Sequence, residues 1–399
     1  MESSDGWLAG ASPPSSEGAD AAHRLEVAGV TAGDRVLVVN AGSSSLKLSV
    51  VEADGRATGT KTLETVARSL SPRVVADEIL GFGPIDAVGH RVVHGGEAYR
   101  QATVVDDGVL ARLRGLTSLA PIHQPRSLAA LETVRRALPD VAHVACFDTA
   151  FHATLPPAAS TYAIPREWRE KWPLRRYGFH GLSHAYASRR TAELLGRPLE
   201  DVRTVTCHLG AGASLAAVAG GRSVDTTMGF TPLEGLVMAT RSGSVDPGLV
   251  LWVQAEGGLT ARETQDGLEN DSGLVGLAET ADMRGVLSRA AGGDADATLA
   301  LDVYVHRVRA GIAAMAASLG GIDALAFTGG VGEHAPEIRR RAVDGLGFLG
   351  VALDPARNES ADGDAVVGIT GGPAAAVVVT SREDLEIARQ VRAALEARA

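Results

Sequence analysis

The sequence predicts an α/β fold made of two related domains. Strand-like β-branched runs alternate with amphipathic helical patterns along most of the chain, which is typical of this class. One unit, a strand followed by a turn of small residues and a second strand, occurs twice, which indicates two related domains facing one another. Glycine makes up 47 of 399 residues, about 12% against roughly 7% in typical chains, so many backbone segments lie where a side chain would obstruct them.

The repeated unit carries the first functional signal. Its first copy spans 35–51 with the turn at 40–45, and its second spans 204–218 with the turn at 208–214. A turn of small residues exposes successive backbone N–H groups to an anion. We therefore expect two phosphate-binding turns, although a single hairpin of this kind is more often only structural.

The remaining elements alternate in type and favour largely buried sheets. We expect strands at 87–94, 143–147 and 324–327, a turn at 328–332, and helices at 127–138, 299–319, 337–343 and 383–395. The chain then divides into a flexible leader (1–32), an N-terminal domain (33–150 plus 384–399) and a nucleotide-binding domain (151–383).

Charge and cysteine content exclude several classes of protein. The net charge of −10 argues against a nucleic acid or an anionic membrane as the main partner. Cys146 and Cys207 lie in apolar runs, which indicates buried thiols in a reducing compartment rather than a disulfide. The N-terminus lacks a secretory pattern, and the longest apolar stretch, about 310–321, is too short to span a bilayer. We therefore expect a cytoplasmic protein.

The sequence does not support several other common catalytic and metal-binding motifs. The chain has no Walker A sequence and no G-x-S-x-G serine elbow. A G-x-G-x-x-G match at 345–350 follows a helix and precedes a strand, the reverse of the dinucleotide-binding context. The pairs His90/His94 and His180/His184 have four-residue spacing, but neither carries the glutamate of a zinc-protease helix, so we do not expect zinc.

Seven segments, in order, resemble successive motifs of the acetate kinase family. They are VNAGSSSLK (39–47), GHRVVHGGE (89–97), FDTAFH (147–152), YGFHG (177–181), TTMGFTPLEG (226–235), TRSG (240–243) and FTGGVGE (327–333). The resemblance covers about 35–390. It implies a duplicated actin-like, sugar-kinase-like (ribonuclease H-like) fold with an interdomain cleft, a homodimer, and Mg²⁺-dependent direct in-line transfer of the ATP γ-phosphoryl to acetate, giving acetyl phosphate and ADP.

The resemblance also implies the catalytic residues. Arg91 and Arg241 match the two arginines that hold the acyl carboxylate and the transferring phosphate, and such charges are needed because two anions must meet. His180 matches the histidine that donates to the phosphoryl group, and Asp148 matches the aspartate that positions Mg²⁺ and the carboxylate. Without the resemblance, the arginines would be read as solvated or capping side chains and Asp148 as a helix cap.

The binding residues follow from the same matches. The first phosphate turn is assigned Asn40, Ser43, Ser45 and Lys47; the second is assigned His208, Leu209, Gly210, Ala211 and Gly212; the adenosine side is assigned Asp282, Met283, Arg284, Gly329, Gly330, Val331 and Gly332. An acyl-methyl pocket is assigned Val93, Ile122, Phe179 and Pro232, although spacing alone would make these ordinary core residues. Asn40 and Glu383 are assigned to Mg²⁺, with Mn²⁺ as the alternative metal.

The sequence departs from the family pattern at several positions. Ala211, Gln124 and His334 each replace an Asn, Ser244 replaces an Asp, and the stretch 277–281 lacks the usual Ser and Gly. The change at Ala211 removes a side-chain amide from the second turn but leaves its backbone donors. We therefore expect altered efficiency or nucleotide choice rather than an inactive enzyme.

Two alternative functions stay open. A kinase for propionate or another short-chain acid would need a similar site, because one methylene in an apolar pocket is worth only about 1–3 kcal/mol. An actin-like nucleotide-binding assembly protein would share the fold. Arg91, Arg241 and Asp148 in the predicted cleft argue against this second alternative.

Overall fold

The computed structural model describes residues 33–42, 45–64, 72–120 and 123–398. These residues belong to one compact unit. The predicted leader (1–32) and the site candidates Ser43 and Ile122 lie outside the described residues. The proposed division of the rest into two domains at 150 and 383 stays a prediction.

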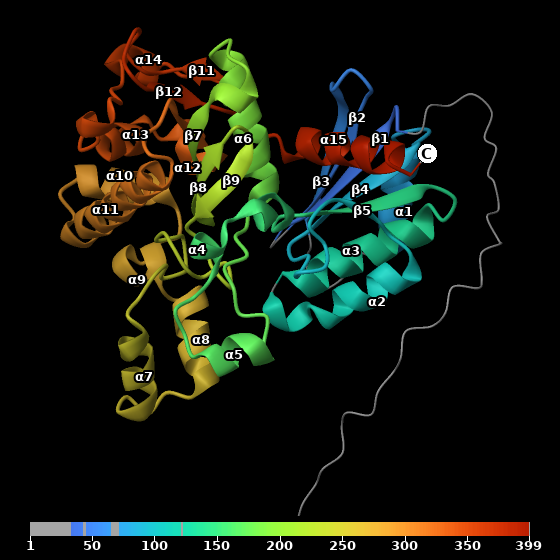
Figure 1. Ribbon diagram of the computed structural model, residues 1–399, viewed down its shortest axis with the longest axis horizontal. Helices are drawn as coiled ribbons and strands as arrows, with labels where there is room; N and C mark the ends of the chain where they lie inside the picture. Colours follow the sequence, from blue (N-terminus) through green and yellow to red (C-terminus); the bar gives the residue numbers. More distant parts are fainter. Residues whose placement is uncertain (1–32, 43–44, 65–71, 121–122, 399) are drawn as a thin grey trace, which may run out of the picture. The chain divides into compact units, whose positions relative to one another are not determined.

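Two six-stranded mixed sheets form the framework (Figure 1). The first has the order β3-β2-β1-β4-β6-β5, built from β1 (Val36–Ala41), β2 (Ser45–Val51), β3 (Ala57–Glu64), β4 (Ala87–Val92), β5 (Thr103–Val104) and β6 (Ala142–Phe147). The second has the order β11-β12-β10-β7-β8-β9, built from β7 (Arg203–Leu209), β8 (Ala213–Ala219), β9 (Arg222–Thr226), β10 (Ala324–Thr328), β11 (Ala365–Val366) and β12 (Ala375–Val378).

The two sheets have the same topology. In each, three antiparallel strands (β1–β3 or β7–β9) are followed by two strands parallel to the first (β4 and β6, or β10 and β12) and by an antiparallel edge strand. The repeated unit of the sequence forms the β1–β2 and β7–β8 hairpins, so the predicted duplication is confirmed. The second predicted phosphate turn is the tip of the β7–β8 hairpin, and the described residues of the first lie at the facing ends of β1 and β2.

Strand β1 shows how the first sheet is buried on both faces. Val36 and Val38 pack on one side against α15 (Glu383–Glu396), while Leu37 and Val39 pack on the other against α1 (Pro72–Leu80) and α3 (Gln124–Ala137). This alternation is the two-residue period of a strand. Helix α2 (Asp107–Gly115) covers α3 and completes this side.

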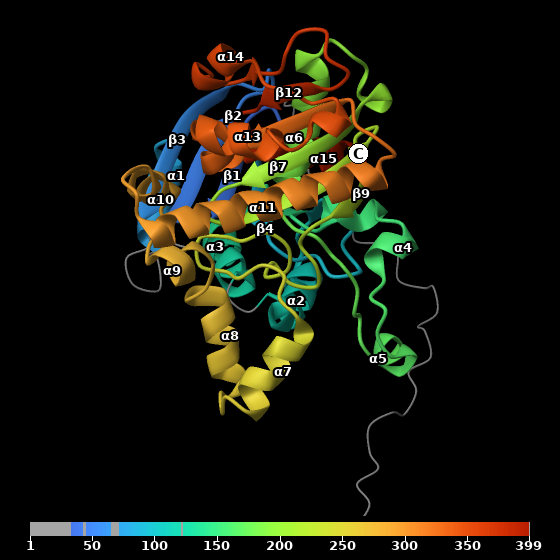
Figure 2. The same cartoon turned by 90° about the vertical axis from the view of Figure 1, so that its left-hand side faces the viewer.

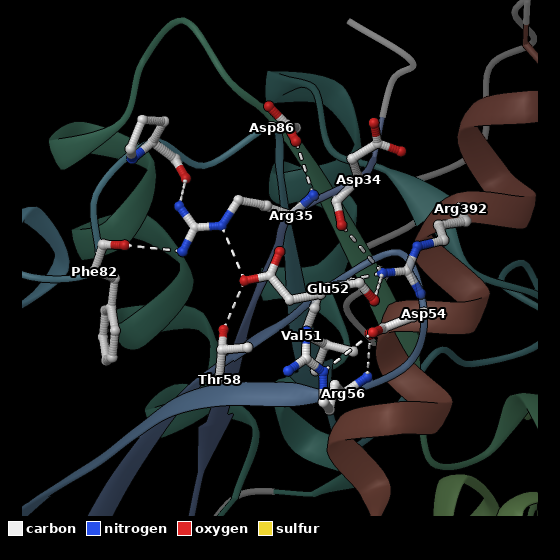
Figure 3. A network of polar contacts seen from close by, with 11 residues as sticks. Asp34, Arg35, Val51, Glu52, Asp54, Arg56, Thr58, Phe82, Asp86 and Arg392 are labelled. Carbon is white, nitrogen blue, oxygen red and sulfur yellow. Dashed lines mark hydrogen bonds and ion pairs between the residues drawn. The ribbon is translucent and has the colours of Figure 1, made fainter.

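Helix α15 approaches the first sheet closely because β4 offers a glycine. A Cβ atom at Gly89 would lie 2.5 Å from Ile387 Cγ2, so only glycine allows this contact. The other end of α15 is anchored by Arg392, which donates to the carbonyls of Gly33 and Glu52. Figure 3 shows the contact of Arg392 with Glu52 beside the network in which Arg35 binds the Glu52 side chain. The first residue of α15, Glu383, is thereby held near the strand ends.

The second sheet carries α6 (Gly181–Leu194) against β7 and β10 and the 24-residue α11 (Ala295–Ser318) against β8 (Figure 2). Helix α6 also packs against α15. The predicted turn at 328–332 is wrong: the chain enters helix α12 (Gly329–His334) directly after β10. Gly329 makes this possible, because its φ is +78° and a Cβ there would lie 2.8 Å from the Leu209 carbonyl oxygen.

Shorter helices connect these elements. They are α4 (Pro157–Ser160), α5 (Arg166–Lys171), α7 (Pro247–Ala255), α8 (Ala261–Asn270), α9 (Gly273–Ala278), α10 (Met283–Ala291), α13 (Pro336–Val343) and α14 (Pro355–Glu359), with 3₁₀ turns at Thr117–Leu119, Ala150–Thr154, Leu199–Asp201 and Gly347–Leu349. The rejected G-x-G-x-x-G match lies in the loop after α13, as expected. Among the described residues, no helix has the length and apolarity needed to cross a membrane.

Candidate functional site

Four predicted site residues meet at the ends of the first-sheet strands. Arg91 lies in β4, and its guanidinium donates to Asp148, directly after β6, with Nη2–Oδ2 at 2.7 Å and Nε–Oδ1 at 3.2 Å. Nη1 lies 3.3 Å from both Asn40 Oδ1 at the end of β1 and Glu383 Oε2. Asn40 Nδ2 donates to the same Glu383 oxygen at 2.8 Å. Arg91 therefore joins two carboxylates and an amide from segments far apart in the sequence.

Burial and pairing set the charges of this cluster. Burial disfavours the Arg91 cation, but Asp148 and Glu383 outweigh that effect and raise its pKa above the ordinary value. Burial raises the pKa of Asp148, which is 1% exposed, and Arg91 opposes this rise. Burial also disfavours the Glu383 anion, but Arg91 outweighs it with help from His208, so the Glu383 pKa is lowered. Arg91 is thus a fixed cation held between two acidic groups.

The donor set of this cluster fits Mg²⁺. The ion prefers oxygen ligands and is usually held by one or two carboxylates plus phosphates and water. Asn40 Oδ1 and the carboxylates of Asp148 and Glu383 supply such oxygens, and both contacts that Glu383 makes in the cluster use Oε2. Within the described part of the chain, no three His, Cys, Asp or Glu side chains gather as a metal site of their own. A magnesium ion here would rely on phosphates and water for most of its ligands.

His180 stands beside this cluster, at the start of α6. Its backbone is left-handed with φ 55°, a conformation that costs energy for a residue other than glycine and that recurs at functional sites. Its ring packs on His208 with centroids 4.4 Å apart. Burial lowers the pKa of His180 well below its ordinary value, and the charges of Arg91 and Arg241 act in the same direction. These effects favour a neutral His180 imidazole.

Arg241 faces a cavity of about 550 Å³. Its Nη1 donates to the Pro232 carbonyl at 2.7 Å, and a Cβ atom built on Gly212 would lie 2.7 Å from its Nη2 and 3.3 Å from His180 Nε2. Ala211, Pro232 and His123 also line this cavity. A larger cavity of about 750 Å³ elsewhere in the molecule is lined by none of the predicted site residues, so chemistry rather than size identifies the site.

The acyl-pocket candidates are only partly brought together. Pro232 lines the cavity beside Arg241, whereas Val93 and Phe179 do not line it and belong to the second sheet's hydrophobic core, where they are 7% and 1% exposed. The structure therefore favours the interpretation of Val93 and Phe179 as ordinary core residues. Phe179 nevertheless directly precedes His180 in the chain.

The described phosphate and nucleotide candidates occupy four places. Asn40, Ser45 and exposed Lys47 lie on the β1–β2 hairpin, and His208 to Gly212 form the β7–β8 tip, where Gly210 N donates to the Gly212 carbonyl at 3.0 Å. The adenosine-side candidates divide between α10 and α12. Asp282 caps α10 and pairs with Arg284, Met283 is buried, and the glycines with Val331 form the first turn of α12. Met283 and Val331 nevertheless belong to the same hydrophobic cluster.

The loop that carries Pro232 is held by a three-residue network. Glu234 accepts a hydrogen bond from Tyr162 Oη at 2.5 Å and from Arg176 Nη2 at 2.7 Å. Arg176 Nη1 also donates to the Met228 carbonyl at 3.0 Å. Because Tyr177 N binds the Gly229 carbonyl at 3.0 Å, the same loop is tied to the segment leading to His180.

The departures from the family pattern have visible surroundings. Gln124 is fully buried and brackets the His94 backbone, accepting from its N–H at 3.1 Å and donating to its carbonyl at 3.0 Å. Ser244 Oγ accepts from Gly235 N at 3.1 Å. Ala211 and His334 are exposed, and 277–281 lies at the end of α9, where Ala281 borders the cavity. None of these changes breaks the cluster around Arg91.

Sequence reasoning missed His123 and the partners of His180. His123 lines the cavity, and burial, with Arg241 and Arg91, lowers its pKa to about 4. The four-residue spacing of His180 and His184 had meaning, but not for a metal: both rings contact the Ser214 hydroxyl. His180 directly precedes α6 and His184 lies in its first turn, so their four-residue spacing was the signal that could have found this pairing.

A model of the acetokinase family matches residues 60–389. The chain belongs to this family. An acetate kinase from Clavibacter sepedonicus is 46% identical over 390 residues, covering 90% of this chain and 98% of that relative. An acetate kinase from Gloeobacter violaceus is 49% identical over 332 residues, covering 83% of this chain and 80% of that relative.

Two solved structures have a similar fold. An acetate kinase from Porphyromonas gingivalis, 34% identical, has a TM-score of 0.83 and covers 91% of this chain and 100% of its own. A propionate kinase from Francisella tularensis, 32% identical, also has a TM-score of 0.83, covering 90% and 98%. The predicted family and duplicated α/β fold are therefore confirmed.

Proposed function

We propose that this protein is an acetate kinase, a phosphotransferase that moves the γ-phosphoryl group of ATP to the carboxylate of acetate and also catalyses the reverse reaction. Family membership and the acetate kinases among its relatives support this function. The observation in the structure that carries it is the convergence of Asn40, Asp148 and Glu383 on the Arg91 guanidinium, with His180 and Arg241 nearby.

The arrangement suits direct in-line transfer. An acetate oxygen forms a bond to the γ-phosphorus while the bond from that phosphorus to the ADP oxygen breaks, so no enzyme nucleophile is needed. Arg91 and Arg241 bring positive charge to the meeting point of two anions, and neutral His180 offers a hydrogen bond to the transferring group. Arginine is suited to this task because its planar fork binds carboxylates and phosphates with two hydrogen bonds.

We propose Mg²⁺ as the cofactor, with Asn40, Asp148 and Glu383 on its protein side and Mn²⁺ as a substitute. When bound, the ion neutralises charge on the phosphates. The β7–β8 tip at 208–214 and the described residues of the β1–β2 hairpin would supply donors to those phosphates, and the adenosine would lie toward α10 and α12. Arg91 now pairs with Asp148. If Asp148 bound the ion, Arg91 would be free to bind the acyl carboxylate instead.

Comparing kcat/KM for acetate, propionate and butyrate at one ATP concentration tests the substrate. We expect acetate to be preferred, by about 10-fold or more per added methylene, because each must be fitted into the same cavity. A higher kcat/KM for propionate would favour a propionate kinase, which is the second candidate function. The similarity to the solved propionate kinase structure supports this candidate.

We further propose that the protein is a homodimer that associates through α7. Leu251 and Trp252 on this helix are 66% and 62% exposed, Leu249 lies beside them, and Figures 1 and 2 show α7 and α8 projecting away from the sheets. An apolar surface of this kind marks a protein interface. Light scattering should give about twice the 41.1 kDa chain mass, and Leu251→Glu with Trp252→Glu should give monomers. A wild-type monomer, or an unchanged dimer in the double variant, would contradict this.

A further inference from the structure

A continuous chain of hydrogen bonds leads from the interior of the second sheet to His180. Ser214 Oγ in β8 lies 2.9 Å from His180 Nδ1 and 2.8 Å from His184 Nε2. His184 Nδ1 in turn lies 2.8 Å from Thr206 Oγ1 in β7. Thr206, His184 and Ser214 are each fully buried, so water does not compete for these groups.

The chain has a direction if the Thr206 proton lies in its shorter contact. The Thr206 hydroxyl is 2.8 Å from His184 Nδ1 but 3.4 Å from the Ala216 carbonyl, which is longer than an ordinary O–H···O hydrogen bond. A neutral imidazole carries one N–H, so His184 must then donate from Nε2 to Ser214. Ser214 has one proton left to give, and it donates to His180 Nδ1.

This direction decides which face His180 presents to the cleft. With Nδ1 acting as acceptor, the single ring proton lies on Nε2. This nitrogen and Arg241 Nη2 both lie close to Gly212, at 3.3 Å and 2.7 Å from the position that a Cβ atom would take there. The opposite direction would place a lone pair there, and a lone pair repels a phosphoryl oxygen. Because burial keeps the pKa of His180 low, a second ring proton is not available to correct the wrong tautomer.

We propose that Ser214 and His184, oriented by Thr206, are positioning residues that hold the proton of His180 on Nε2. They touch neither substrate nor reacting atoms and act only through His180. The relay itself depends on the hydrogen bonds described above. Its consequence for phosphoryl transfer rests on the proposed acetate kinase function.

The tautomer can be observed directly in the full-length protein. Long-range ¹H–¹⁵N spectra of protein labelled with ¹⁵N-histidine separate protonated from unprotonated ring nitrogens, and the His180→Gln variant identifies the His180 signals. We expect a protonated Nε2 and an unprotonated Nδ1 at both His180 and His184. A proton on Nδ1 of His180 would overturn the proposal.

Matched serine variants test the relay. Ser214→Ala should release the His180 tautomer and lower kcat by about 10- to 100-fold, the range known for groups that orient a functional histidine, with KM changed far less. Ser223→Ala is the control, because its Oγ makes a similar buried contact, 2.8 Å from His152 Nδ1, outside the relay. It should leave the His180 tautomer and kcat unchanged. An unchanged tautomer in Ser214→Ala would overturn the relay.

A second pair of variants covers a failure of Ser214→Ala to fold. The amide of His184→Gln can donate to Ser214 and accept from Thr206, whereas His184→Leu can do neither. We expect the first to retain the His180 tautomer and the second to lose it. The spectra can be recorded without turnover, so they test the relay separately from the activity. If the protein showed the predicted tautomer but no acetate kinase activity, the proposed function would be contradicted and the relay would not.

Discussion

Replacing Arg91 with alanine is expected to lower kcat/KM for acetyl phosphate formation by about 10³- to 10⁵-fold, the range observed for arginines that stabilise phosphoryl transfer. The substitution removes the cation that joins Asp148, Asn40 and Glu383. Steady-state kinetics with the purified variant measure the effect. Arg262→Ala in α8, where the side chain is 91% exposed, is the matched control and should keep normal kinetics.

Arg91→Ala should also destabilise the protein, and this must be separated from catalysis. The variant leaves Asp148 buried without its counterion, which typically costs about 3–5 kcal/mol. Adding Asp148→Asn removes the buried charge, so the double variant should recover much of the unfolding free energy but none of the activity. Normal activity in Arg91→Ala would remove Arg91 from the site, and activity that returned with stability would assign it a structural role.

Replacing Arg241 with alanine should have a second large effect, again about 10³-fold or more in kcat/KM. Arg241 faces the cavity, and its Nη1 donates to the Pro232 carbonyl. Arg241→Lys keeps the charge but loses the planar fork, so we expect it to restore only a small part of the activity. The same Arg262→Ala control applies.

Stability should distinguish the two arginines. Arg241 has no carboxylate partner at salt-bridge distance within the described residues, so Arg241→Ala leaves no buried anion unpaired and should unfold at nearly the wild-type midpoint. A variant with normal kcat/KM, or one whose loss of activity follows a loss of folded protein, would contradict a catalytic role for Arg241.

The strand framework could be predicted because its signal is local. The β-branched runs that form β1 and β7 are buried, and the turn after each is made of small residues. The missed strand β3 is largely exposed and threonine-rich, so it lacks a buried face that would mark it. Helix α6 was missed because, apart from Leu182, it buries small residues and His184 rather than large apolar side chains.

The site could be predicted as a set of residues but not as a network. Motifs identified Arg91 and Asp148, but their pairing depends on β4 and β6 being parallel neighbours in register, Val92 opposite Phe147. The relay behind His180 depends on where β8 places one hydroxyl, and a serine in an apolar strand carries no such signal in the sequence. The roles assigned to the individual site residues stay predictions until the variants are measured.

The central claim is tested most directly by trapping the product. Purified protein with ATP, Mg²⁺ and acetate is treated with hydroxylamine, which converts an acyl phosphate to a hydroxamate, while ADP is measured in parallel. We predict hydroxamate and ADP in equal amounts, with neither formed when acetate is omitted or Mg²⁺ is removed by EDTA. ADP release without hydroxamate, or nucleotide-dependent filaments with no product, would contradict an acetate kinase.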